Sequence, residues 1–153
     1  MFVLLLLSIS GLIDSLYLTW EHYRKVIPPC TVNHLLPILS DCGKVLTSPY
    51  AVAFGVPLAL FGVFHYGLLS ILFTATFFSK NKIIKYIVII ESIGGFFASI
   101  YFMYIQLIVI KSICIYCTLS ALISFIIIYL VFKKLRKERF ELFLVSCFQR
   151  LQS

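Results

Sequence analysis

The chain has 153 residues, of which 61% are hydrophobic and only 12% are charged. Soluble domains are about half apolar and about one quarter charged, so this composition excludes an ordinary soluble protein. The net charge of +7 would suit a nucleic-acid-binding protein. However, five of the thirteen basic residues lie between Lys133 and Arg139, beside an apolar run. Such a cluster is typical of the flank of a membrane span, so we expect membrane lipid, and no nucleic acid, as a partner.

Four apolar segments are long enough to cross a bilayer, which takes roughly 20 residues each. They cover residues 2–20, 57–78, 86–110 and 113–132. Prolines break the polar segment 21–48, which we interpret as a long loop. The sequence therefore predicts an all-α integral membrane protein with a four-transmembrane-helix bundle in domain 1–135. A basic tail, 136–153, follows it.

The distribution of Lys and Arg predicts the orientation of the bundle. The connection between the second and third spans is basic, and so is the tail after the fourth span. Both lie on the same side of a four-span protein. Because basic loops stay in the cytoplasm, we expect both termini to be cytoplasmic. The long loop and the turn at Lys111 are then extracytoplasmic.

The segment 47–57 joins the long loop to the second span. Ser48 followed by Pro49 is typical of a helix N-cap with proline at the first helical position, and Gly55 is suited to end that turn. We predict a short interfacial half-helix here, before the second span. Tyr50 then lies at the level of the lipid headgroups or over a pocket.

Four of the five cysteines fall on the extracytoplasmic side. Cys30 and Cys42 share the long loop, whereas Cys114 and Cys117 open the fourth span in a Cys-Ile-Tyr-Cys motif. Two thiols at this spacing in the first turn of a helix can close a small disulfide ring. The helix N-terminus also stabilises the thiolate that exchanges disulfides. We therefore predict a redox-active pair. The fifth, Cys147, is expected to be an inert cytoplasmic thiol.

Two other interpretations of the cysteines are open. A structural zinc ion needs four ligands in a closed tetrahedral site, which the irregular spacing of Cys30 and Cys42 fits poorly, so we expect no metal. A non-enzymatic protein with two static disulfides is the second. Against it, a disulfide that closes the very short ring of the motif adds little stability, because it removes little conformational entropy from the unfolded chain. The chain also has no glycine-rich nucleotide motif, so no nucleotide is expected. Cys117, about one turn into a membrane helix, has a lipid-soluble quinone as its natural electron acceptor.

The sequence closely resembles the vitamin K epoxide reductase family, in its prokaryotic branch, over about residues 8–125. The resemblance lies in Tyr17-Leu-Thr19, Asp41-Cys-Gly-Lys-Val-Leu-Thr-Ser48, Pro49-Tyr-Ala-Val-Ala-Phe-Gly-Val-Pro-Leu-Ala-Leu-Phe-Gly62 and Cys114-Ile-Tyr-Cys-Thr-Leu-Ser-Ala121. It implies a four-helix bundle around a quinone of the ubiquinone, menaquinone or vitamin K type. It also implies a prokaryotic cytoplasmic (inner) membrane.

The resemblance further implies a thiol–quinone oxidoreductase that generates disulfides. The thiols of a thioredoxin-fold partner would reduce a Cys30–Cys42 disulfide. Cys42 would attack Cys114, and Cys117 would deliver the electrons to the quinone. Four residues match positions that line the quinone pocket in the family: Ser48, Tyr50, Phe61 and His65.

The chain departs from the family pattern in two places. Many prokaryotic members carry a fused thioredoxin-like domain, whereas roughly twenty residues follow the fourth span here, so we expect a stand-alone form with a separate partner. Ala121 stands where vertebrate members have a tyrosine. This difference argues against vitamin K epoxide reduction, which is the alternative activity within the same class.

Polar and small residues in the spans carry further expectations. Asp14 is costly in lipid and suggests a function, either in quinone protonation or as a hydrogen-bonded group inside the bundle. Glu91 is expected to pack or to snorkel. Small residues in the third span are expected to allow close helix packing: Gly94, Gly95, Ala98 and Ser99.

Overall fold

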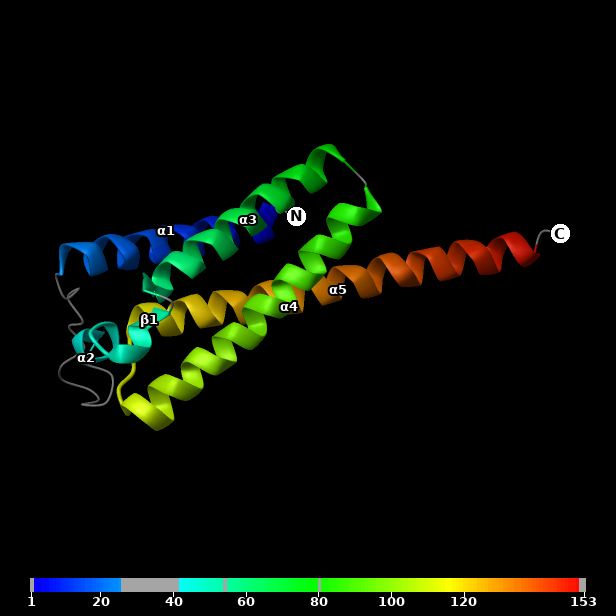
Figure 1. Ribbon diagram of the computed structural model, residues 1–153. Coiled ribbons are helices and arrows are strands. Elements are labelled where there is room, and N and C mark those ends of the chain that lie inside the picture. Colours follow the sequence, from blue (N-terminus) through cyan, green and yellow to red (C-terminus); the bar gives the residue numbers. More distant parts are fainter. Residues whose placement is uncertain (1, 26–41, 54, 80, 152–153) are drawn as a thin grey trace.

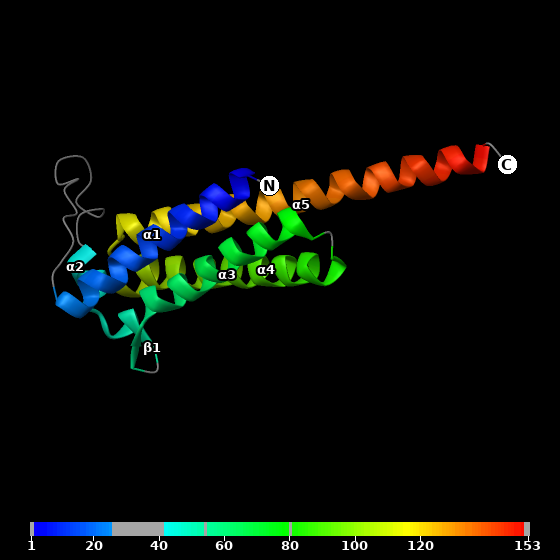
Figure 2. The same cartoon turned by 90° about the horizontal axis from the view of Figure 1, so that it is seen from above.

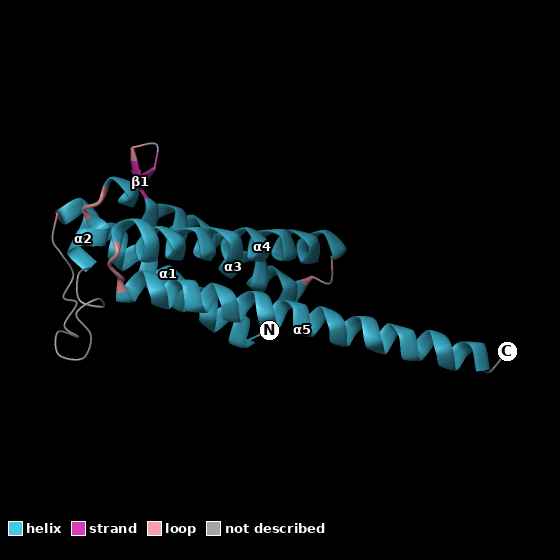
Figure 3. Ribbon diagram, turned by 90° about the horizontal axis from the view of Figure 1, so that it is seen from below, coloured by secondary structure: helices cyan, strands magenta, loops and turns pink. Residues whose placement is uncertain are grey.

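The computed structural model describes residues 2–25, 42–53, 55–79 and 81–151, with side chains described as far as Lys137. Within these residues, four helices are long and apolar enough to cross a membrane. They are α1 (Phe2–Arg24), α3 (Leu58–Phe78), α4 (Lys82–Tyr104) with its continuation η3 (Ile105–Ile110), and α5 (Ile115–Leu151). In Figure 1, α1 lies along α3 while α4 crosses α5, and Figure 3 shows how little of the described fold is not helical. The predicted four-helix membrane fold is confirmed.

Short elements cover one end of the bundle. They are α2 (Cys42–Leu46), the 3₁₀ turn η2 (Pro49–Ala51), and the antiparallel strands β1 (Val52–Ala53) and β2 (Val56–Pro57). Figure 2 shows α2 and β1 at this end, and the connection from α3 to α4 at the opposite end. The segment 21–48 was predicted as one loop. Instead, α1 continues to Arg24 and α2 begins at Cys42, whereas residues 26–41 lie outside the described residues.

The predicted half-helix is reduced to the single turn η2. Ser48 precedes it with extended dihedral angles, and Pro49 follows, as expected. The Ser48 hydroxyl, however, donates to the Val45 carbonyl (2.8 Å) and caps nothing in η2. Gly55, at φ 80°, supplies the left-handed residue of a tight turn between β1 and β2. A hairpin therefore replaces further helix, with Val52 opposite Pro57 and Ala53 opposite Val56.

Helix ends differ from the predicted spans because helices continue beyond the apolar residues. α4 begins at Lys82, four residues before the predicted span. Asn81 is its N-cap, since the side chain accepts a hydrogen bond from the Ile83 N–H (2.9 Å). At the other end of the chain, α5 continues without a break through the predicted tail to Leu151.

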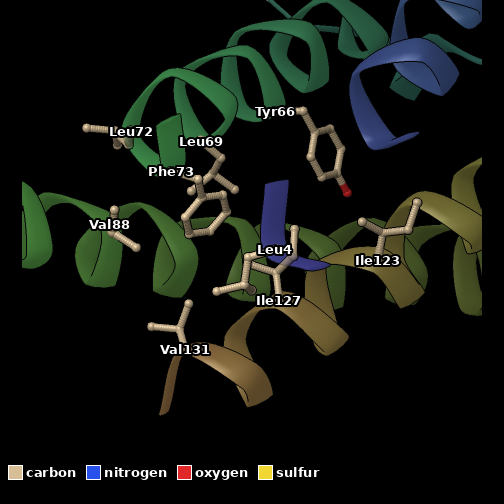
Figure 4. Packing of buried hydrophobic residues seen from close by; sticks show 9 residues of the cluster. All are labelled: Leu4, Tyr66, Leu69, Leu72, Phe73, Val88, Ile123, Ile127 and Val131. Atoms are coloured by element: carbon tan, nitrogen blue, oxygen red, sulfur yellow. The ribbon is translucent and has the colours of Figure 1, made fainter. Parts of the chain in front are cut away.

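Tyr66 of α3 joins three helices at the centre of the bundle (Figure 4). Only 2% of it is exposed. Its hydroxyl donates to the Ser120 carbonyl of α5 (2.6 Å) and lies 2.8 Å from the Ser124 hydroxyl. Its ring lies against Gly11 of α1, where a Cβ atom would be 2.6 Å from the ring carbons. The rest of this core is Leu4, Leu69, Leu72, Phe73, Val88, Ile123, Ile127 and Val131.

We expect Gly11→Ala to destabilise the bundle by about 1–3 kcal/mol, the usual cost of overpacking a core. The added methyl group overlaps the Tyr66 ring, which cannot move away without losing its hydrogen bonds to α5. Gly67→Ala is the matched control, because a Cβ atom there would be 3.8 Å from its nearest neighbour, Leu12. Thermal unfolding of both variants in the same detergent measures the difference. Equal melting temperatures would contradict this packing.

Candidate active site

The Cys114–Cys117 pair lies at the start of α5. Cys114 directly precedes the helix, and its carbonyl accepts a hydrogen bond from the Thr118 N–H (3.0 Å). Its own N–H donates to the side-chain oxygen of Gln106 (3.0 Å). Both cysteines are free thiols. Cys114 is fully buried and Cys117 partly so.

Gln106 is a site residue that the sequence reasoning missed. It lies in η3, a π-helical segment, and such wide turns are frequent at functional sites. Its backbone carbonyl accepts hydrogen bonds from the backbone N–H groups of Lys111 and Ser112, where the chain turns toward α5. Only 4% of Gln106 is exposed. The one signal in the sequence was an amide side chain within an apolar span.

Cys42 begins α2 and packs into the same buried cluster as Cys114 and Val45. Cys42 is disulfide-bonded. Both Cys42 and Cys114 are fully buried. The structure thus gathers three of the four predicted cysteines. The fourth, Cys30, lies outside the described residues.

The surroundings of Cys114 favour its thiolate. A hydrogen bond with the Cys117 thiol lowers the pKa of Cys114, and the backbone N–H groups of Cys117 and Tyr116 act in the same direction. Burial and the charge of Asp14 oppose this shift. A lower pKa leaves more thiolate at neutral pH, and the thiolate is the species that attacks a disulfide. Cys114 therefore has the character of an attacking thiol.

We expect Cys117→Ala to move the titration of Cys114 to higher pH, because it removes the hydrogen bond that favours the thiolate. Cys117→Ser keeps a donor at the same position, so its shift should be smaller. The ultraviolet absorbance of the thiolate measures both, in a background in which Cys30, Cys42 and Cys147 are replaced by serine. An unchanged titration in Cys117→Ala would exclude this hydrogen bond as the cause.

A cavity of about 280 Å³ lies beside Cys117, between the four long helices and the short elements. This is near the lower end of the usual range for ligand pockets, about 300–1,000 Å³. Of the described cysteines, only Cys117 lines the cavity. The lining also includes every residue predicted for the quinone pocket: Ser48, Tyr50, Phe61 and His65.

These four residues occupy different depths of the cavity. Tyr50 and Phe61 are 49% and 45% exposed, so they lie at its rim. The His65 side chain is only 16% exposed. Ser48 lies next to α2, bonded through its hydroxyl to the Val45 carbonyl.

Two acidic residues also line the cavity, from α1 and α4. Asp14 is buried, and its Oδ2 atom has no hydrogen-bond partner among the described residues. Glu91 was expected to pack or to snorkel. Instead, its Oε1 lies 2.9 Å from Nδ1 of His65. The pair joins α3 to α4 in the cavity wall.

The small residues of α4 shape the cavity wall, and at Gly95 they also allow the close packing that was predicted. Gly94, Gly95, Ala98 and Ser99 all line the cavity. A Cβ atom on Gly95 would overlap the imidazole ring of His65, whereas one on Gly94 would meet nothing within 4 Å. Their small size therefore makes room for the cavity and for a side chain from α3.

Two comparisons with known proteins agree with this arrangement. The model of the Vitamin K epoxide reductase family matches residues 2–132. Thiol-disulfide oxidoreductase LTO1 of Arabidopsis thaliana is 31% identical over 141 residues, which cover 85% of this chain and 35% of that relative. The chain thus spans about a third of the relative's length. The matched family residues include α1, α3, α4 with η3, residues 115–132 of α5 and the cysteine cluster described above.

Proposed function

Since the chain belongs to the vitamin K epoxide reductase family, we propose that it is a membrane thiol–quinone oxidoreductase that generates disulfides. One observation carries this proposal. The Cys114–Cys117 pair is a free dithiol whose second member lines a mostly apolar cavity inside the bundle. A thiol in the cavity wall can reduce a ligand held in the cavity. A quinone suits this site because its ring is apolar and its two carbonyl oxygens accept hydrogen bonds.

Electrons enter from the dithiol of a separate thioredoxin-fold partner, which reduces a Cys30–Cys42 disulfide. The Cys42 thiolate then attacks the Cys114–Cys117 disulfide at Cys114. Cys30 resolves this mixed disulfide, so Cys114 and Cys117 become the dithiol. The packing of Cys42 and Cys114 in one buried cluster supports the transfer between the two pairs.

Cys117 and Cys114 then reduce the quinone. Oxidation of the dithiol to a disulfide releases two electrons and two protons, and the quinone takes up both to become the hydroquinone. Cys117 lines the cavity, so its sulfur meets the quinone, while the fully buried Cys114 closes the disulfide. Ser48, Tyr50, Phe61 and His65 hold the quinone, which is of the ubiquinone, menaquinone or vitamin K type.

The catalytic domain comprises residues 1–135 in a prokaryotic inner membrane, with the cysteines on its extracytoplasmic face and both termini in the cytoplasm. Two features support this orientation. α4 begins at Lys82, next to the connection from α3 that lies at the end of the bundle opposite α2, and residues 133–139 include five basic residues. The oxidising extracytoplasmic compartment is also where disulfides persist.

The test is quinone reduction by the purified protein with a dithiol as electron source. We expect turnover by the wild type, none above background by Cys114→Ser, and wild-type turnover by Cys147→Ser. No turnover by the wild type would contradict the proposal. A protein with static disulfides would instead show no change in thiol labelling when quinone is added after mild reduction. Turnover of a quinone epoxide, measured in parallel, distinguishes quinone reduction from the related epoxide reductase activity. For that second activity, Ala121 in the cavity wall provides no hydroxyl group.

A further inference from the structure

The histidine–carboxylate pair in the cavity wall has no role in the transfer of electrons between cysteines. His65 and Glu91 come from α3 and α4 and are 26 positions apart in the chain. Both line the same cavity as Cys117. A partly buried polar pair within membrane-spanning helices is costly and marks a functional site by default.

One nitrogen of His65 is left over. Nδ1 bonds to Glu91, but Nε2 is buried and has no partner among the described residues. Leaving such an atom unpaired is unfavourable, because it has lost its hydrogen bond to water and gained none from the protein. Nε2 lies next to Gly95, which also lines the cavity and has no side chain to cover the ring. A ligand in the cavity is therefore the natural source of the missing partner.

We propose that His65 and Glu91 form a proton-transfer pair that delivers a proton to a carbonyl oxygen of the quinone in the cavity. This inference rests on the proposed function. Electrons then reach the quinone from α5 and a proton reaches it from α3.

The hydrogen bond to Glu91 fixes the chemistry of His65. A carboxylate only accepts hydrogen bonds, so Nδ1 carries a proton that it donates to Glu91. In the imidazolium form, Nε2 carries a second proton and can give it to the quinone oxygen. In the neutral form, Nε2 is only an acceptor and cannot protonate the quinone.

Atoms and electrons balance in this step. The Cys114–Cys117 dithiol gives two electrons to the quinone, forms the S–S bond and releases two protons. His65 transfers its Nε2 proton to one quinone oxygen, and one of the protons released by the thiols restores the imidazolium. The second released proton completes the hydroquinone.

Other titratable groups that line the cavity are Asp14, His22, Tyr50, Tyr66 and Cys117. The Tyr66 hydroxyl is occupied by Ser120 and Ser124 of α5. Asp14 is the main competitor, because its Oδ2 atom is also buried and unpartnered within the described part of the chain. A test must therefore separate His65 from Asp14.

The experiment measures kcat for quinone reduction against pH in the wild type, His65→Gln, Glu91→Gln, Gly95→Ala and Asp14→Asn. A proton donor works only in its protonated form, so kcat of the wild type is expected to fall with rising pH. His65→Gln removes this alkaline fall and lowers kcat about 10²–10⁴-fold, the usual range for general acid catalysis. In Glu91→Gln the fall begins at lower pH, because an amide stabilises the imidazolium less than a carboxylate does. Gly95→Ala lowers kcat by displacing the ring.

Ser92→Ala is the matched control, because Ser92 is buried in α4 next to Glu91 but does not line the cavity. Reduction of the Cys114–Cys117 disulfide by dithiol, measured separately, should be unchanged in the His65, Glu91, Gly95 and Ser92 variants. If the pH profile of Glu91→Gln superimposes on that of an active wild type, the proposed proton-transfer pair is wrong, whereas the proposed quinone reductase activity is not contradicted. The same holds if Asp14→Asn, instead of His65→Gln, removes the alkaline fall. A wild type that does not reduce quinone overturns both.

Discussion

Replacement of Cys117 by serine is expected to stop quinone reduction and to trap Cys42 in a disulfide with Cys114. Cys117 is the described cysteine that lines the cavity, and a serine hydroxyl can neither form a disulfide nor act as an unassisted nucleophile at neutral pH. We expect a loss of at least about 10³-fold, as for removal of other catalytic nucleophiles.

The trapped disulfide has a structural reason. In the reduced inner pair, Cys114 has a lowered pKa and packs in the same cluster as the disulfide-bonded Cys42. Its thiolate can attack Cys42, and in the wild type Cys117 reverses this by displacing Cys42 from Cys114. Without Cys117 only Cys30 can break the bond between Cys42 and Cys114, so this bond accumulates. Peptide mapping by mass spectrometry without reductant detects it, and Cys114→Ser is the control that cannot form it. Full quinone reduction by Cys117→Ser would show that the relay is wrong.

Replacement of Cys42 by serine is expected to separate the two halves of the reaction. A small dithiol reaches the Cys114–Cys117 disulfide directly, so its oxidation should continue within a few-fold of the wild-type rate. A thioredoxin-fold protein is too large to reach the fully buried Cys114, so its oxidation should fall by about 10²-fold or more, since proximity of the reacting groups is lost.

Oxidation of the protein dithiol is the measurement, and oxidation of the small dithiol by the same variant is its control. Cys147→Ser should leave both rates unchanged. If Cys42→Ser still oxidises the protein dithiol at the wild-type rate, the electrons do not pass through Cys42. If it loses activity with both donors, α2 has a structural role and the two pairs are not separate stages.

The four membrane helices could be predicted because hydropathy depends on neighbouring residues alone. The short elements could not. α2 has five residues, Cys42–Leu46, too few for a periodic pattern. The hairpin of β1 and β2 depends on the backbone angle at Gly55. In the sequence, the same glycine was equally compatible with the end of a half-helix.

The candidate site shows a similar division. The spacing of Cys114 and Cys117 predicts redox chemistry by itself, whereas the place of Cys42 beside Cys114 depended on the family resemblance. The His65–Glu91 pair was missed because it joins helices 26 positions apart in the chain. Gln106 was missed although Cys114 is only eight positions away, because their contact depends on the turn between η3 and α5. A single polar residue in an apolar span indicates a cost, but its partner is fixed only by helix packing.

A single-turnover reaction tests the central claim most directly. Fully reduced Cys30→Ser/Cys42→Ser protein, in which the new disulfide cannot pass to the loop pair, is mixed anaerobically with one equivalent of quinone, and the hydroquinone formed and the thiols remaining are counted. The account predicts one hydroquinone and the loss of two thiols per quinone consumed, with the new disulfide mapped between Cys114 and Cys117. Consumption of quinone without a disulfide at these two cysteines, or no consumption at all, would contradict it.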